Sequence, residues 1–509
     1  MITLSPLNAA TTVALAPLAD SANRVPVVSA DVIDRQGVAL SSPSTVVTIP
    51  SSIGVVALET YTPEGTLAGF APTVTTASES RDAVTLQMLD SYTAAQTMTG
   101  QFSGVGGALL DRFKTTGSGF SQSVSTTGGV VPTPPQGPKG EIDLTFKTKS
   151  GVTVDIEIDS GGGSLSASIK SSGKLSDSER SAVAKLADGF QQAIDGLSAT
   201  SPKLDVSGLA QFDASALASM NFQYNVTNDG SANISGSYSQ SSATRSLSIK
   251  SAEGAIGISV DTSNSALRSA SSQRAASVAS YLKQFDQANS DGHGNAALMS
   301  MFEDGFAQMN EDYGTPSGQV LPGAAYAPAL QQADQAMLTG LGDFSASITD
   351  ATTSPNPMRP GEVDSFSYQV SQTTELAGSQ LDGQITQHQQ SHLSASYHQG
   401  EPVLTSSRSS QNYDYVQIDD RTASTVRIAT ERGALLDASL KRSSDQKTRD
   451  SKYEEGEMIS DVTTPEERSQ SSDLLALLKP LIDNGDATRD SVEWRQALSS
   501  IHGLIQLGA

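Results

Sequence analysis

Hydrophobic and polar residues alternate with a period of two in several stretches of the chain. The clearest run starts at Glu141, where apolar residues take every second position through 142–146, 152–158 and 165–169, with Ser-Gly and Gly-rich turns between them. Such alternation is typical of antiparallel strands with one buried and one solvated face. We therefore predict a three-stranded antiparallel meander. The same alternation predicts four further strands, at 221–226, 231–238, 244–250 and 254–260.

Apolar residues recur at helical spacing in other stretches. An apolar stripe over 183–194 follows Ser176 and Glu179, which have the spacing of an N-terminal capping box. This pattern predicts one well-defined amphipathic helix. Similar spacing predicts two short helices or one broken helix in 81–113, two helices at 269–285 and 296–309, an Ala-rich helical stretch at 323–351, and C-terminal helices at 473–482 and 491–504.

Changes in composition divide the chain into four parts. Residues 1–80 are rich in Ser, Thr, Ala, Val and Pro, and their β-prone patches are short, which predicts a weakly ordered arm or a segment that folds on a partner. Gly, Ser and Pro gather at 117–140 and again at 355–361, which predicts linkers. The predicted organisation is a low-complexity arm at 1–80, a helical segment with a Pro/Gly linker at 81–138, a β-meander with helices at 139–354, and a second β-rich region with C-terminal helices at 355–509.

These elements predict an α+β fold, in which antiparallel β-meanders carry amphipathic helical hairpins behind a weakly ordered N-terminal arm. Residues 140–173 and 413–444 resemble each other, since both contain a charged hairpin that ends in Leu-x-Ala-Ser-Ile/Leu-Lys. Convergent strand composition and duplication of a β-plus-helix unit both explain this similarity.

Charge and composition exclude several classes of function. The net charge is −23 and the chain has no basic run, which argues against nucleic-acid binding. The chain has no Cys, which excludes disulfides, thiolate catalysis and Cys-type metal sites. No apolar run approaches the roughly 18 residues of a membrane helix, and the first residues do not have the pattern of a signal peptide. We expect no nucleic-acid partner and no membrane insertion.

Three of the five His residues lie close together in the sequence, at His388, His392 and His398. Their spacing is that of the zinc ligands in metzincin proteases. However, Gln389 stands where the general base is needed, and an amide cannot take a proton from zinc-bound water. The surrounding residues alternate like a strand, which places the first and last His about 33 Å apart. We therefore expect a solvated strand face, with a weak metal site as the alternative.

Two other polar patterns have weaker chemical meaning. The stretch DQANSDGHGN at 286–295 resembles a calcium-binding EF-hand loop, with Gly292 at the sixth position, but Leu298 cannot supply the final bidentate carboxylate. We expect a polar helix–helix loop there, with a weak Ca²⁺ site as the alternative. An exposed polar strand face, rather than a glycosidase carboxylate pair, is expected for Asp155, Glu157 and Asp159.

Three segments of the chain resemble a group of acidic, Ser-rich proteins of Pseudomonas and its relatives. They are TLSPLNAATTVALAPL at 3–18, DLTFKTKSGVTVDIEI at 143–158 and LDVSGLAQFDASALASMNF at 204–222. Automatic naming sometimes gives such proteins the name lactate dehydrogenase, which implies a Gly-rich Rossmann turn after a strand. The nearest candidate, GVGGAL at 104–109, lacks the third Gly and follows no predicted strand. We therefore assign no catalytic, cofactor-binding or metal-binding residue and expect no cofactor.

The composition indicates a function only by class. Ser occurs 77 times, Trp once and Cys not at all, and an acidic, Ser/Thr/Gly/Ala-rich composition is typical of flagellins, adhesins and substrates of leaderless secretion. We expect a non-enzymatic bacterial protein, secreted or surface-associated, with a structural or interaction role through a protein partner or self-association. The alternatives are a hydrolase or oxidoreductase whose site is not visible as a motif, and a cytoplasmic partner-binding module.

Overall fold

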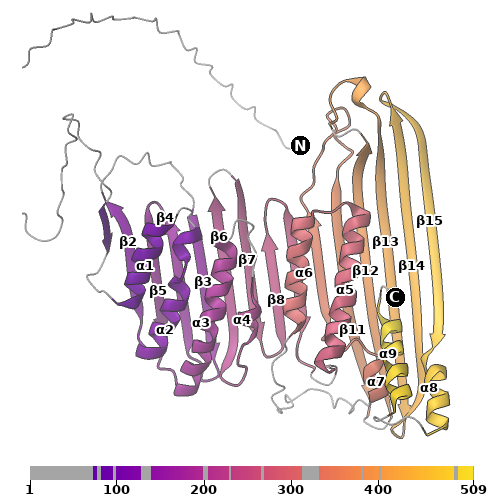
Figure 1. Ribbon diagram of the computed structural model, residues 1–509, viewed down its shortest axis with the longest axis horizontal. Coiled ribbons are helices and arrows are strands. Elements are labelled where there is room, and N and C mark those ends of the chain that lie inside the picture. The colour runs from indigo at the N-terminus through magenta and orange to yellow at the C-terminus, as the bar shows by residue number, and fades with distance from the viewer. Residues whose placement is uncertain are drawn as a thin grey trace, which may run out of the picture. The chain divides into compact units, whose positions relative to one another are not determined.

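Among the residues that the structure describes, fifteen antiparallel strands form one sheet, and the helices lie against one of its faces (Figure 1). The structure is a computed structural model. It describes residues 73–76, 82–95, 99–127, 139–198, 205–228, 231–264, 267, 269–311, 332–379, 382–400, 403–485 and 491–507. These residues belong to one unit, Glu59–Ala509, while the second unit, Met1–Leu58, lies outside the described residues. The predicted α+β class with antiparallel strands is confirmed.

The strands of this sheet differ greatly in length. The first ten are short: β1 (Thr73–Thr76), β2 (Phe120–Thr127), β3 (Lys139–Thr148), β4 (Thr153–Gly161), β5 (Ser164–Ser171), β6 (Leu217–Asn228), β7 (Ser231–Ser241), β8 (Thr244–Lys250), β9 (Gly254–Asp261) and β10 (Phe344–Asp350). The last five are longer: β11 (Ser365–Gly378), β12 (Gly383–Gly400), β13 (Tyr413–Glu431), β14 (Ala434–Glu454) and β15 (Glu457–Asp473).

The helices come between groups of strands. They are α1 (Ala83–Ala94), η1 (Thr99–Phe102), α2 (Val105–Thr116), α3 (Asp177–Ser198), α4 (Ser207–Ala210), α5 (Ser271–Gly292), α6 (Ala296–Glu311), α7 (Gln332–Ala336), η3 (Arg408–Ser410), α8 (Leu474–Asp483) and α9 (Val492–Ile505). The strand order is β1-β2-β5-β4-β3-β6, and β7 to β15 then follow in sequence. The connection through α3 therefore carries the chain from β5 past β4 and β3 to β6.

The predicted meander is confirmed as β3, β4 and β5. Ile142 pairs with Ile158, and Ile158 pairs with Ala167, so the apolar positions of all three strands fall on the same face. The helix predicted after it is α3, and its capping box is formed. The backbone N–H of Ser176 donates to Glu179 Oε2 at 2.8 Å, and the N–H of Glu179 donates to Ser176 Oγ at 3.4 Å. Hydrogen bonds from Ser150 and Ser176 lower the pKa of the buried Glu179 carboxyl to about 2.

Two predicted segments have a different structure. In the described part of 323–351, only α7 is helical, and Phe344–Asp350 forms strand β10. Its alternation of Phe344, Ala346 and Ile348 with Ser and Thr was hidden beside an Ala-rich stretch. The predicted linker 117–140 contains β2, whose Val124 is buried. The predicted arm lies outside the described residues except for β1, which pairs with β2.

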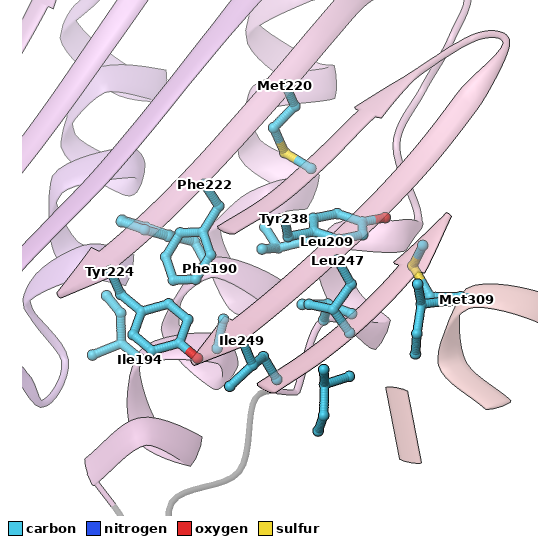
Figure 2. Packing of buried hydrophobic residues seen from close by; sticks show 14 of the residues in the cluster. Phe190, Ile194, Leu209, Met220, Phe222, Tyr224, Tyr238, Leu247, Ile249 and Met309 are labelled. Atoms are coloured by element: carbon cyan, nitrogen blue, oxygen red, sulfur yellow. The ribbon is translucent and has the colours of Figure 1, made fainter. Parts of the chain in front are cut away.

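Apolar side chains fill the space between the helices and the sheet. Figure 2 shows part of the larger cluster, in which Phe190 of α3 meets Phe222 of β6 edge to face, with ring centroids 5.9 Å apart. Ile194 of the same helix and Tyr224 of β6 belong to the same cluster (Figure 2). Full burial of such side chains contributes about 1.5–3 kcal/mol each. A second cluster lies under α7, α8 and α9, and together these clusters fix the helices to one face only.

Candidate functional site

The face of the sheet opposite the helices carries polar side chains from most strands. Side chains alternate across a strand, so residues between the buried apolar positions point to this uncovered face. A row of serines crosses neighbouring strands here, because the register of β7 to β11 aligns them. The row consists of Ser239, Ser246, Ser259, Ser345 and Ser371. The high Ser content of the chain is therefore partly explained by one solvated sheet face.

The uncovered face is hollowed across β8 to β14. The hollow has a volume of about 990 Å³, and its lining includes Ser259, Ser345, Gln390, His392 and Arg421. Most of the lining groups are hydroxyls and amides, which can both donate and accept hydrogen bonds. Volumes of this size occur in ligand sites, although those sites are usually more apolar and more enclosed. The surface is therefore suited to broad polar contact.

The charged groups in the hollow are largely compensated by one another. Arg421 Nη2 lies 2.9 Å from Asp419 Oδ2, and His392 Nε2 lies 3.3 Å from Asp419 Oδ1. Asp445 stands opposite Arg421 in the register of β13 and β14. This part of the face therefore presents polar groups with little excess of either charge.

The same face is acidic over β3 and β4. Asp155, Glu157 and Asp159 alternate there as predicted, and Asp143 of β3 stands opposite Glu157. Burial, together with the neighbouring carboxylates of Glu141, Asp159 and Glu157, raises the pKa of Asp143 to about 6. A smaller hollow of about 370 Å³ lies beside this acidic patch.

The three clustered His residues share one face of β12 but do not meet. His388 Nδ1 is 3.0 Å from Thr425 Oγ1, while His392 lies in the hollow beside Asp419. His398 is at the far end of the strand, in separate surroundings. In the described ranges, no group of three or more His, Cys, Asp or Glu side chains could hold a metal ion. The structure therefore does not bring the His residues into one metal site.

His398 is enclosed between two carboxylates, and its side chain is only 6% exposed. Its Nδ1 lies 2.6 Å from Asp364 Oδ1, and its Nε2 lies 3.3 Å from Glu362 Oε2. The hydroxyl of Tyr413 donates to the same Glu362 oxygen at 2.7 Å. Although an imidazole between acids can serve acid–base catalysis, these groups bond to each other in a packed interior.

The segment predicted as a second linker, 355–361, directly precedes Glu362 and Asp364 and contacts the sheet. The Asn356 side chain is fully buried and donates to Gln411 Oε1 at 2.8 Å and to the Tyr413 hydroxyl at 2.9 Å. Arg359 stacks over Tyr453, with its guanidinium carbon 4.2 Å from the ring centroid. Buried polar hydrogen bonds therefore hold this loop to the sheet, and the Pro and Gly content of the segment does not reveal them.

The predicted EF-hand-like loop is also different in the structure. Helix α5 continues to Gly292, so most of the 286–295 stretch is helical rather than a cation-binding loop. The Gln287 side chain donates to Asp291 Oδ1 at 2.8 Å along the helix surface. Gly292 is close to the Phe366 ring, and a Cβ there would come within 2.7 Å of it. The glycine at the expected loop position therefore serves helix–sheet packing.

The sheet edge at β15 is exposed along nearly its whole length. Pro465 lies in the middle of this strand and cannot donate a backbone hydrogen bond, and Glu466 and Glu467 follow it. Proline and charge on an edge strand disfavour pairing with a strand of another chain. The uncovered face is therefore a better candidate for an interaction surface than this edge.

Comparison of the chain with protein-family models, curated proteins and solved structures finds no match. In the part of the chain that the structure describes, no helix is long and apolar enough to cross a membrane. The candidate site therefore rests on the geometry of the uncovered face alone. Sequence alternation indicated that this face is polar, but it gave no sign of the hollow, which depends on how distant strands pair.

Proposed function

We propose that this protein is a non-enzymatic interaction protein that binds its partner through the hollow on the uncovered face of β8 to β14. The observation that supports this proposal most directly is the one-sided sheet. Helices cover one face, while the other presents a hollow of about 990 Å³ lined by hydroxyl, amide and a few charged groups. Such a face provides many hydrogen-bonding groups to a partner.

The chemistry of the hollow favours a polar partner with little net charge. Asp419 compensates Arg421 and His392, so an anionic polymer would meet no excess of positive charge there. Serine hydroxyls and glutamine amides both donate and accept hydrogen bonds, and many such contacts together give specificity even when each is weak. The enclosed His398 cluster does not support the alternative of an enzyme, because its ring has no room for a substrate.

We further propose that the protein is secreted or surface-associated in the bacterium that produces it. The acidic, Cys-free and Ser-rich composition supports this location. Blotting of culture supernatant, sheared surface material and cytosol, each with a cytosolic marker, tests it. Protein outside the cells without the marker supports the proposal, and protein confined to the cytosol refutes it.

The binding surface is tested with two substitutions of the same kind. Ser345→Trp places an indole in the hollow, while Ser166→Trp places the same bulk on the same face over β5, outside the hollow. Labelled protein is added to the producing cells and the bound fraction is measured. We expect Ser345→Trp to weaken binding at least about tenfold, which corresponds to about 1.4 kcal/mol, and Ser166→Trp to bind like the wild type. Equal binding by both variants would show that the hollow is not the contact surface.

A further inference from the structure

The last helix of the chain, α9, is held to the sheet by an apolar stripe. This stripe is buried against α8 and strands β13 and β14. It consists of Trp494, Leu498, Ile501 and Ile505. Trp494 is the single Trp of the chain and only 6% exposed, so it reports directly on the docking of this helix.

A buried polar cluster also holds the C-terminal end of α9. The Gln389 side chain of β12 donates to the Ile505 carbonyl at 3.0 Å, and Arg442 of β14 donates to the Gln506 carbonyl at 2.7 Å. The Gln506 amide in turn donates to Ser277 Oγ of α5 at 3.0 Å. Polar contacts of this kind depend on correct donor and acceptor roles in a way that apolar packing does not.

His502 lies at the centre of this cluster, between α9 and α5. Its Nδ1 is 3.3 Å from the side-chain nitrogen of Gln273, and its Nε2 is 3.2 Å from Ser277 Oγ. The Gln273 nitrogen also donates to the carbonyls of Gln335 and Leu338, at 2.6 and 2.9 Å. These two carbonyls take both hydrogens of the amide, so Nδ1 faces a nitrogen that cannot accept a hydrogen bond.

The cluster therefore fits one protonation state of the ring. The Ser277 hydroxyl donates to the Thr339 carbonyl at 2.8 Å, which leaves its oxygen to accept from Nε2–H of His502. The Gln506 amide nitrogen, 3.1 Å from Nε2, gives its own hydrogens to Ser277 Oγ and the His502 carbonyl. A neutral ring with its proton on Nε2 can therefore donate to Ser277 Oγ, whereas a second proton on Nδ1 would face the Gln273 amide nitrogen, which cannot accept it.

The surroundings of the ring also disfavour its positive charge. Burial lowers the pKa of His502 below its ordinary value of 6.5, and this effect outweighs the backbone groups of Ala336, Gln273 and Leu338, which favour the charged form. The elements packed around the ring carry titratable side chains of both signs. They include Arg274 and Tyr281 on α5, Asp334 on α7, Arg442 on β14, and Glu493 and Arg495 on α9.

We propose that His502 is an acid-sensitive latch, and that its protonation loosens α9 from the sheet while the sheet itself stays folded. When α9 is loosened, His502 takes up a proton at its ordinary pKa of 6.5, whereas its pKa is lower when α9 is docked. The hold on α9 is therefore complete above about pH 6.5 and is lost as the pH falls through the lower value of the docked state.

Trp494 emission and far-UV circular dichroism, recorded from about pH 8 to about pH 4, test this latch in the full chain. In the wild type, we expect the emission maximum to move to longer wavelength while the sheet signal remains. In His502→Gln, whose amide can still donate to Ser277, we expect the transition to move to lower pH by at least about one unit. His388→Gln, on the uncovered face, is the matched control and is expected to behave like the wild type.

An unchanged transition in His502→Gln would overturn the latch, and so would simultaneous loss of the tryptophan and sheet signals in the wild type. If His502→Gln shows exposed Trp494 even at pH 8, hydrogen exchange of the wild type decides the question. We then expect peptides from α9 to lose protection on acidification, corrected for intrinsic exchange rates, while peptides from β12 keep theirs. Equal protection of α9 at both pH values would refute the proposal.

Discussion

The helical hairpin of α5 and α6 contains a carboxylate pair whose effect on stability can be calculated. Glu303 of α6 lies near Asp286 of α5 and next to Asp304. Burial and these two neighbouring carboxylates raise the pKa of Glu303 from 4.5 to about 7. The folded state therefore holds a proton on Glu303 at a pH where the unfolded chain has lost it.

This difference fixes the direction of the pH dependence. Because the pKa of Glu303 is higher in the folded state, its contribution to stability increases as the pH falls from above 7 toward 4.5. The upper limit of this contribution is about 3 kcal/mol. Glu303 is only partly buried, and solvent screening reduces the expected value to about 1 kcal/mol.

Glu303→Gln removes the ionisable group while keeping a side chain of similar size that can donate to Asp286. Urea unfolding followed by circular dichroism should show the variant to be more stable than the wild type by about 1 kcal/mol at about pH 8 and unchanged at about pH 4, below the ordinary pKa of the carboxyl. Asp188→Asn, at an exposed carboxylate of α3, is the control and should show no such difference. A variant that is no more stable at pH 8, or that gains equally at both pH values, would refute the reasoning.

Two further substitutions test the packing of the fold. Gly189→Ala puts a Cβ 2.3 Å from the Gly208 backbone carbon and should lower the free energy of unfolding by about 3 kcal/mol or more. Gly107→Ala is its control, since the Cβ there meets only ordinary contacts at 3.6 Å; equal urea midpoints for the two variants would contradict the close packing. Asn356→Ala removes both bonds to Gln411 and Tyr413 and should cost about 2–3 kcal/mol in the same assay. Asn484→Ala, at an exposed position, should cost far less, and equal losses would refute the role of the 355–361 loop.

Local patterns predicted much of the secondary structure. The meander of β3 to β5 and the helix α3 follow from alternation and from the Ser176–Glu179 capping box, because both signals arise between residues close in the sequence. β10 was missed because its neighbours favour helix, and helical propensity is a weak signal that pairing with β9 and β11 outweighs.

The candidate site was predicted only in part. The shared strand face of His388, His392 and His398 followed from their even spacing. The partners of His398 could not be predicted, because Glu362 and Asp364 come directly after the 355–361 segment, whose composition indicates a linker, and lie more than 30 residues from His398 in the chain. Similarly, nothing near His502 in the sequence indicates Gln273, which lies on a helix more than 200 residues earlier.

The sequence by itself determined which residues face water and which face the core, because strand and helix periods act over a few residues. It thereby determined the α+β class, the polar face and the lack of thiol chemistry. Only the tertiary structure decided that the strands of the described residues join one sheet, that β2-β5-β4-β3-β6 are neighbours in that order, and that the helices lie on a single face. The hollow and the His502 cluster depend on this arrangement of strands and helices, because each joins side chains from elements far apart in the chain. Such long-range contacts leave no periodic signal in the sequence.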